Sequence, residues 1–337
     1  MNFLLLANLY CCGNFAYQHN GMWLWIILLI VGFVCIIKGA DWLIDGSSSL
    51  ARKYHLSELT IGLTIVAFGT SAPELVVSLF AAAGGHGQVL LGNVIGSNIF
   101  NLLLILGISG FISPIPIQDK TIRNEIPYSV FAGLLILVLG NDSWFSAKSN
   151  ILGWYDGVIF LVFFLLFLFY SFRNRKDDLV PEAPAVIYNS AKTFLLILAG
   201  LILLVMGGRL VVENAVKLAH SFGISEKIIG LTLVAGGTSL PELAASAVAA
   251  WKKRSGLAIG NVIGSNIFNI LLILGSSVTF TSVPYPSSFN MDVVLYLIIS
   301  LVLLASMYTG VQKQFDRWEA AIFLLLYCGY IAFLFFR

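Results

Sequence analysis

Two glutamates, Glu74 and Glu242, lie deep within long apolar stretches of the chain. An ionised side chain near the middle of a membrane-spanning helix costs about 2.5–3.5 kcal/mol even on lenient insertion scales, so each glutamate needs a compensating partner. No Lys or Arg stands beside either of them in the sequence. A bound cation is therefore the simplest compensation, and the chemistry indicated is cation coordination in apolar surroundings.

Hydroxyl groups accompany both glutamates at helical spacing. Thr70 and Ser71 stand four and three positions before Glu74, so on one continuous helix all three oxygens share a face. The second copy of this pattern consists of Thr238, Ser239 and Glu242. Each glutamate also follows a proline, which lacks an N–H and clashes with the preceding turn. We therefore expect both helices to bend and to free carbonyls such as those of Ala67 and Ala235.

A second pair of segments, GNVIGSNIFN at 92–101 and again at 260–269, adds hydroxyl and amide groups. Each copy places a Ser and an Asn four positions apart, and its glycines would let the helices pack closely. The candidate ligands are Ser97, Asn101, Ser265 and Asn269, with Asn98 and Asn266 beside them. Together with the glutamates they form an all-oxygen set, which suits Ca²⁺ and Na⁺ and disfavours soft metals, because no His or Cys joins it. Two ionised glutamates would balance one Ca²⁺, so we expect the ions to be substrates and expect no cofactor.

Plainer interpretations compete with a cation site. A single Ser or Thr in a membrane helix most often bonds back to its own chain or to a neighbouring helix. The two glutamates could also be protonated groups that are hydrogen-bonded between helices. The recurrence of the whole pattern at two equivalent places favours the cation site.

The composition is typical of a membrane protein. Of 337 residues, 58% are hydrophobic and 11% are charged, against roughly a quarter charged in soluble domains. The formal net charge of +2 is too small to suggest nucleic acid. Ten stretches are long enough to cross a hydrocarbon core of about 30 Å, so we predict an all-α polytopic membrane protein with ten transmembrane helices. The predicted spans are 22–46, 58–83, 88–112, 125–140, 152–172, 191–219, 226–250, 256–280, 290–309 and 317–336.

The distribution of basic residues predicts the orientation of these spans. If the spans alternate in direction, fourteen of the nineteen Lys and Arg residues fall on one side, and the basic side is the cytoplasmic one. Both termini then lie outside the cytoplasm. The predicted organisation is a short N-terminal segment at 1–21, a first repeat at 22–172, a cytoplasmic linker at 173–190 and a second repeat at 191–337.

An offset of 168 residues aligns the chain with itself without a gap. The segment at 69–75 recurs at 237–243 with one change, and the segment at 92–101 recurs unchanged at 260–269. Each copy holds five predicted spans, an odd number, so the second copy enters the membrane from the opposite side. This predicts two inverted five-helix repeats with a binding site near the bilayer midplane, where the repeats meet.

At these motifs the sequence resembles the cation/calcium exchanger superfamily, in particular the prokaryotic sodium/calcium exchangers. GTSAPE, GTSLPE and the two copies of GNVIGSNIFN are similar to that family's paired alpha-repeats, and the resemblance covers nearly the whole chain. It implies antiport of Ca²⁺ against Na⁺ by alternating access, in which the first and sixth helices slide across a core. It also implies a prokaryotic inner membrane, and no obligatory protein partner is evident. By position it makes Glu74 and Glu242 central ligands, supported by Thr70, Ser71, Ser97, Asn101, Thr238, Ser239 and Ser265.

One residue departs from the family pattern, and three other functions compete. Many relatives carry Asp at the position of Asn269. In the potassium-dependent branch of the superfamily that Asp is associated with the use of K⁺, so the Asn in this chain argues against K⁺ cotransport. Proton-coupled Ca²⁺ or Mn²⁺ exchangers tend to place an acid after the GN pair, where this chain has Val94 and Ile95, which favours Na⁺ coupling. An intramembrane enzyme could use paired carboxylates, but no nucleophile accompanies them, so we expect no enzyme. A passive channel would conduct without a counter-ion.

Overall fold

The computed structural model describes residues 3–144, 149–173, 186–222 and 235–336, and these residues are almost entirely helical. The elements of the first half are α1 (Phe3–Lys53), α2 (Glu58–Ile61), η1 (Gly62–Val66), α3 (Ala67–Thr70), α4 (Ala72–Ala83), α5 (Gly87–Phe100), η2 (Asn101–Ile105), α6 (Leu106–Ile112), β1 (Ile115–Pro116), η3 (Thr121–Glu125), α7 (Ile126–Gly140), η4 (Asp142–Trp144), β2 (Ile151–Leu152) and α8 (Trp154–Arg173). Those of the second half are α9 (Ser190–Ser221), α11 (Ala235–Gly237), α12 (Leu240–Trp251), α13 (Ser255–Ile267), η6 (Phe268–Leu274), α14 (Gly275–Phe280), β3 (Val283–Pro284), α15 (Phe289–Ser306), β4 (Gln314–Phe315) and α16 (Arg317–Phe336).

Within the described residues, eight helices are long and apolar enough to cross a membrane, or nine if the bent pair Glu58–Thr70 and Ala72–Ala83 is one span. The eight are Met22–Lys53, Gly87–Ile112, Thr121–Gly140, Trp154–Arg173, Ser190–Ser221, Ser255–Phe280, Phe289–Ser306 and Arg317–Leu334. These spans agree with nine of the ten predicted ones. The remaining predicted span, 226–250, lies partly outside the described residues, so the count of ten stays a prediction. The predicted N-terminal segment is helical from Phe3 and continuous with the first span.

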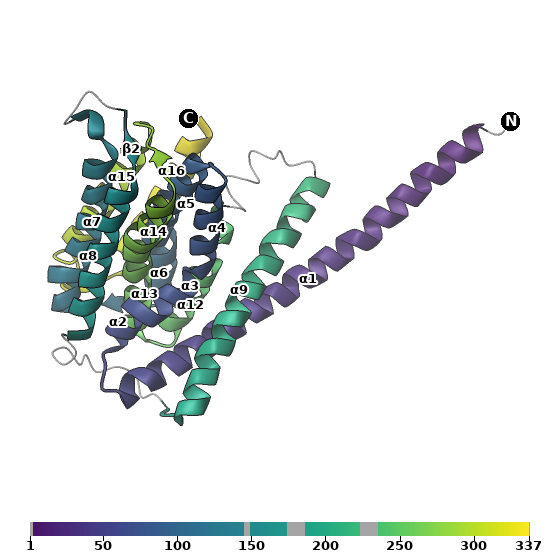
Figure 1. The fold of residues 1–337 in the computed structure, drawn as a ribbon. Coiled ribbons are helices and arrows are strands. Elements are labelled where there is room, and N and C mark those ends of the chain that lie inside the picture. The colour runs from purple at the N-terminus through teal and green to yellow at the C-terminus, as the bar shows by residue number, and fades with distance from the viewer. Residues whose placement is uncertain (1–2, 145–148, 174–185, 223–234, 337) are drawn as a thin grey trace.

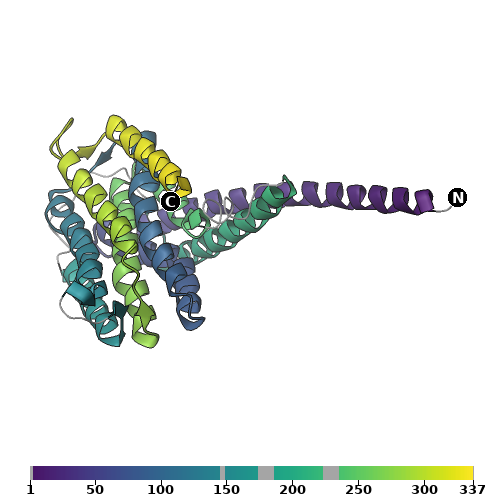
Figure 2. The same cartoon turned by 90° about the horizontal axis from the view of Figure 1, so that it is seen from above.

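One helix lies deep in the bundle, and two long helices lie at its side. Of the apolar window within Ser255–Phe280, 94% is buried, whereas 17% is buried in Met22–Lys53. The long helices α1 and α9 cross each other at the side of the bundle, and α1 extends beyond it (Figure 1, Figure 2). The fold therefore includes a bundle with α13 in its interior and two long helices, α1 and α9, beside it. We call these two helices the α1–α9 pair.

Glycines hold the α1–α9 pair together at backbone distance. A Cβ atom on Gly39 would lie 2.8 Å from the carbonyl oxygen of Gly200, and one on Gly32 would lie 3.0 Å from that of Gly207. Increasing positions on α1 thus meet decreasing positions on α9, so the two helices run antiparallel. The two contacts are also equivalent under the 168-residue offset. Small residues of this kind let membrane helices approach closely.

The same close packing at glycines was predicted for the GNVIGSNIFN segments. It is confirmed in the second copy, where a Cβ on Gly260 would lie 2.8 Å from the Leu59 carbonyl oxygen and one on Gly264 would meet Leu63 at 2.8 Å. Helix α13 therefore packs backbone to backbone against α2 and η1. In the first copy, no described residue lies within 4 Å of a Cβ on Gly92 or Gly96. Their repeat-related partners fall outside the described residues, so there the expectation stays a prediction.

Two short antiparallel strand pairs join the ends of distant spans. Residues 115–116 of β1 pair with 314–315 of β4, and residues 151–152 of β2 pair with 283–284 of β3. Strands β1 and β3 are related by the 168-residue offset. These pairs connect the first half of the chain to the second at the ends of the bundle.

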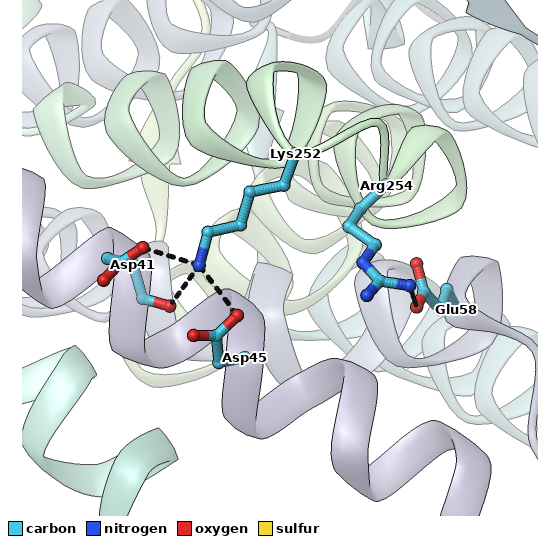
Figure 3. A network of polar contacts seen from close by, with 5 residues as sticks. All are labelled: Asp41, Asp45, Glu58, Lys252 and Arg254. Carbon is cyan, nitrogen blue, oxygen red and sulfur yellow. Dashed lines mark hydrogen bonds and ion pairs between the residues drawn. The ribbon is translucent and has the colours of Figure 1, made fainter. Parts of the chain in front are cut away.

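Ion pairs connect α1 and α2 to the end of α12 (Figure 3). Lys252 lies 2.5 Å from an Asp41 carboxylate oxygen and 2.7 Å from one of Asp45. Arg254 lies 3.1 Å from the carboxylate of Glu58. The first pairs are half exposed, whereas the side chains of Arg254 and Glu58 are 9% and 3% exposed. The end of the helix that carries Glu242 is therefore fixed to both α1 and α2.

Among the described residues, these contacts have no counterpart in the other half of the repeat. The positions equivalent to Lys252 and Arg254 are Gly84 and His86. At the positions equivalent to the two aspartates, Arg209 and Glu213 form an ion pair with each other within α9, at 2.6 Å. In the part of the chain that the structure describes, the ionic connection between the α1–α9 pair and the core is thus found at one end of the molecule.

Glu58 is the first residue of α2. Ser57 is the N-cap of this helix, and its hydroxyl accepts the N–H of Thr60 at 3.0 Å. The carboxylate of Glu58 is buried against Arg254. The equivalent residue, Glu226, lies outside the described part of the chain.

We expect Arg254→Gln to destabilise the protein far more than Lys252→Gln. Removing one member of a buried ion pair leaves an uncompensated charge and costs about 3–5 kcal/mol, whereas a half-exposed pair contributes about 1 kcal/mol or less. Denaturant titration of the purified variants in detergent measures the free energy of unfolding of each. Equal effects of the two substitutions would contradict the assignment of the Arg254–Glu58 pair as the stabilising one.

Candidate cation site

Both glutamates follow a break in their helix. Helix α3 ends at Thr70, α4 begins at Ala72, and the two segments are bent by 49°. Pro73 stands in the first turn of α4 and Pro241 in that of α12, where a missing N–H costs nothing. The predicted bend is confirmed for the first copy.

The carbonyl expected to be freed by this bend is not free. The Ala67 carbonyl oxygen accepts the Ser71 N–H at 3.0 Å and lies 3.4 Å from the Thr70 hydroxyl. The prediction for Ala67 was therefore wrong, because the residue four positions before Pro73 is Gly69. Ala235 is the first described residue after a gap, and the expectation for its carbonyl stays a prediction.

The breaks let each serine reach the glutamate of the other repeat. The Ser71 hydroxyl donates to Oε1 of Glu242 at 2.8 Å. In the equivalent contact, the Ser239 hydroxyl donates to Oε1 of Glu74 at 2.9 Å. All four side chains are buried, with at most 2% of any of them exposed. The expected arrangement, with each serine on the face of its own glutamate, is replaced by a crossed one that joins the two repeats.

Asn261 fixes one side of this arrangement. Its Nδ2 donates to the carbonyl oxygen of Glu242 at 3.2 Å and to the Ser246 hydroxyl at 2.9 Å. Its Oδ1 accepts the Thr70 hydroxyl at 3.1 Å. Thr70 is thereby oriented by the opposite repeat, with its hydrogen used and its oxygen lone pairs available.

The GNVIGSNIFN segments bring further oxygens to the same place. Ser239 lies 3.3 Å from the Ser97 hydroxyl, which connects α5 to the crossed serine–glutamate contacts. Asn101 is the first residue of η2 and Asn269 the second of η6. Both elements are π-helical turns, which occur frequently at functional sites. The amides of these two residues are held by reciprocal contacts, with Nδ2 of Asn101 on Asn266 and Nδ2 of Asn269 on Asn98, each at 3.0 Å.

Six buried oxygens of the predicted residues have no hydrogen-bond partner among the described residues. They are Oε2 of Glu74, Oε2 of Glu242, Oδ1 of Asn101, Oδ1 of Asn269, Oγ of Ser265 and Oγ1 of Thr238. Buried polar groups are normally paired, and each exception requires an explanation. Carboxylate, amide and hydroxyl oxygens are the ligands that Ca²⁺ and Na⁺ take in proteins. The donor set therefore fits a hard cation.

The two ends of the site differ in their surroundings. Ser97 and Thr238 line a pocket of about 420 Å³, together with Asn93 and Asp292. Their repeat equivalents, Ser265 and Thr70, are fully buried. The site is thus approached by a pocket at its Ser97 end.

The structure adds residues that the sequence interpretation missed. Asn261 orients Thr70 and the helix of Glu242. The GN pair is repeated, with Asn93 at the position equivalent to Asn261, and this repetition could have indicated its role. Asp292 lines the pocket near Ser97. Its repeat equivalent is Asn124, so the repeat gave no indication of it.

Fold and site together define a class of protein. A helical membrane protein in which two related segments converge on buried carboxylates has the architecture of a secondary transporter. The sequence profile of the sodium/calcium exchanger protein family matches residues 24–173 and 192–336. The chain belongs to this family, which confirms the resemblance of its motifs.

Similar proteins extend over nearly the whole chain. The putative antiporter CaxA of Alkalimonas amylolytica is 38% identical over 320 residues, which is 92% of this chain and 98% of CaxA. The sodium/calcium exchanger MaX1 of Methanosarcina acetivorans is 33% identical over 92% of this chain and 98% of its own. The solved structure of the sodium–calcium exchanger NCX_Mj, soaked with zero Na⁺ and Ca²⁺, is 34% identical. It covers 92% of this chain and 99% of its own, with a TM-score of 0.79.

A matched pair of cysteine variants tests the unequal ends of the site. In a background without the native cysteines, we expect Ser97→Cys to react with a small charged thiol reagent faster than Ser265→Cys. A buried thiol reacts only through opening of the structure, and an opening that costs about 1.4 kcal/mol slows labelling about tenfold. Labelling rates from mass spectrometry decide the question. Equal rates, or faster labelling at position 265, would contradict a pocket at the Ser97 end.

Proposed function

We propose that the protein exchanges Ca²⁺ for Na⁺ across the membrane at the site centred on Glu74 and Glu242. The observation that carries the proposal is the pair of crossed serine–glutamate contacts, together with six buried oxygens of the predicted residues that have no hydrogen-bond partner among the described residues. The names of its relatives, sodium/calcium exchangers among them, support the same pair of ions. The remaining predicted residues, Thr70, Ser71, Ser97 and Ser239, supply or orient further oxygens.

Charge balance gives the two glutamates their role in exchange. Bringing two ionised carboxylates into a dry interior costs several kcal/mol each unless an opposite charge compensates them. One Ca²⁺ neutralises both, and Na⁺ ions can replace it on the same oxygens. Because the site is costly when it holds no cation, release of one ion is favoured by binding of the other, which is the condition for coupled antiport.

The way the fold is divided supports alternating access. The α1–α9 pair packs on itself through glycines and lies beside the core, so we propose that it slides as a unit over the helices that carry the site when the half-exposed ion pairs of Lys252 with Asp41 and Asp45 separate. The antiparallel relation of α1 and α9 supports two inverted five-helix repeats, with the site at their meeting point. Such repeats commonly exchange their conformations to open the site to each side in turn.

The orientation that we propose places both termini outside the cytoplasm and the linker at 173–190 inside, in a prokaryotic inner membrane. The excess of basic residues on one side supports it. The pocket at Ser97 would then face outward. An impermeant thiol reagent applied to intact cells labels Ser97→Cys in that orientation and fails to label it in the reverse one.

The exchange proposal is tested with purified protein in liposomes. We expect uptake of radioactive Ca²⁺ that requires an outward Na⁺ gradient. In Glu74→Gln and Glu242→Gln we expect uptake to fall by roughly 30-fold or more, since losing one partner of a buried charge pair costs about 2–5 kcal/mol. The readout is the initial rate with a Na⁺ gradient, a pH gradient or no gradient.

Glu319→Gln is the matched control for this experiment. Glu319 is also a buried glutamate, but its carboxylate binds Thr309 and the N–H of Asp316, away from the site. It should keep Na⁺-driven uptake. Uptake driven only by the pH gradient would assign the protein to proton-coupled exchange, and uptake without any gradient dependence would assign it to passive conduction. Full activity of both glutamine variants would refute the site.

We also expect exchange to be independent of K⁺. Position 269 carries an amide, and the carboxylate associated with K⁺ use in the potassium-dependent branch is absent from the sequence. Replacing K⁺ by choline on both sides of the liposome membrane should leave the rate of Na⁺-driven Ca²⁺ uptake unchanged. Stimulation by K⁺ would show that the amide at Asn269 does not exclude K⁺ coupling.

A further inference from the structure

Four buried asparagines form a chain of amide contacts beside the glutamates. Asn98 and Asn101 come from α5 and η2, and Asn266 and Asn269 from α13 and η6. At most 1% of each side chain is exposed. An asparagine amide has an oxygen end that attracts a cation and an NH₂ end that repels one. The direction of each amide therefore decides whether the residue can serve as a ligand.

The direction of the Asn98 amide is set by a group that cannot reverse. Its Nδ2 donates to the main-chain carbonyl oxygen of Asn266 at 3.2 Å, and a carbonyl oxygen only accepts. Oδ1 of Asn98 is thereby left for its other neighbour, and it accepts Nδ2 of Asn269 at 3.0 Å. The NH₂ group of Asn269 is used in this contact. Its Oδ1 remains buried with no partner in the described part of the chain.

We propose that Asn98 is a positioning residue that makes Asn269 present its carbonyl oxygen to the transported cation. The proposal rests on the proposed function, because it assigns a role at the same site. Without Asn98, the Asn269 amide has no acceptor to hold its NH₂ group, and it can turn that group toward the ion. The main-chain carbonyl of residue 266 thus determines, through Asn98, the polarity of the site at Asn269.

The other half of the repeat holds the same contact without this anchor. Nδ2 of Asn101 donates to Oδ1 of Asn266 at 3.0 Å, which leaves Oδ1 of Asn101 unpaired among the described residues. Nδ2 of Asn266, however, has no hydrogen-bond partner there. The anchored chain is therefore the one that passes through Asn98 to Asn269.

A carboxylate at position 269 makes the orientation irrelevant. Both ends of a carboxylate are oxygens, so an Asp offers an oxygen to the cation in either direction. Replacing Asn98 should therefore weaken Ca²⁺ binding when residue 269 is Asn and should change it little when residue 269 is Asp. Replacing a residue needed only for packing would weaken Ca²⁺ binding equally in both backgrounds.

The test measures Ca²⁺ affinity in wild type, Asn98→Ala, Asn269→Asp and the double variant, as purified full-length proteins binding radioactive Ca²⁺. We expect Asn98→Ala to weaken binding about tenfold in the wild-type background, the equivalent of one orienting hydrogen bond. In the Asn269→Asp background, we expect a change of less than about threefold. An equal loss in both backgrounds, or no loss in either, would overturn the proposal.

Two further variants control for folding. Asn141 is a buried asparagine away from the site that also donates to a main-chain carbonyl, that of Leu137 at 2.8 Å, and contacts another asparagine, Asn290. Asn141→Ala should bind Ca²⁺ as wild type does. Asn98→Leu fills the volume of the amide without its polar atoms, and it replaces the alanine variant in the same four-protein comparison if the latter does not fold.

Binding and transport are measured separately so that the two proposals can fail separately. A wild-type protein that binds Ca²⁺ but does not exchange it for Na⁺ would refute the proposed function, while the affinity ratios would still decide the role of Asn98. A wild-type protein that exchanges the ions and shows equal losses in both backgrounds would refute the role of Asn98 alone. A folded wild-type protein that binds neither ion would overturn both.

Discussion

The burial of two carboxylates in the core of a helical bundle is the constraint on which the rest of the structure depends. An ionised carboxylate in such a place is stable only with opposite charge and hydrogen bonds around it. The crossed bonds from Ser71 to Glu242 and from Ser239 to Glu74 supply part of this. In the function that we propose, a cation supplies the rest, held by oxygens that have no hydrogen-bond partner among the described residues. A site that needs a cation for its stability, and that can hold different cations, would then be the physical basis of exchange.

The packing of the bundle serves this constraint. Helix breaks at Ser71 and Ser239 turn hydroxyls away from their own helices, and Gly260 and Gly264 bring α13 to backbone contact with the first repeat. The α1–α9 pair, in contrast, is held mainly to itself. It is joined to the core by the half-exposed ion pairs of Lys252 with Asp41 and Asp45.

The two copies of the repeat have unequal surroundings. The pocket reaches Ser97 and Thr238, while Ser265 and Thr70 are buried, and the Lys252 ion pairs to Asp41 and Asp45 exist at one end only (Figure 3). In the exchange that we propose, two symmetric orientations would be populated equally, and these unequal ionic contacts would give the two orientations different energies.

Much of this protein was determined by its sequence alone. Apolar length predicted nine spans that the structure describes. The two glutamates were singled out because an unpaired charge in a membrane segment is too costly to be incidental, and the 168-residue repeat pointed to the eight other candidate ligands. The tertiary structure alone decided which groups meet. Local spacing placed Ser71 beside Glu74, but the helix break sends its hydroxyl to Glu242. The proline at position 73 predicted a free carbonyl at Ala67, whose oxygen is in fact hydrogen-bonded. The direction of the Asn269 amide depends on a main-chain carbonyl three positions earlier, reached through Asn98 on another helix. Contacts between segments so far apart in the chain follow from packing, which a pattern of residue types does not encode.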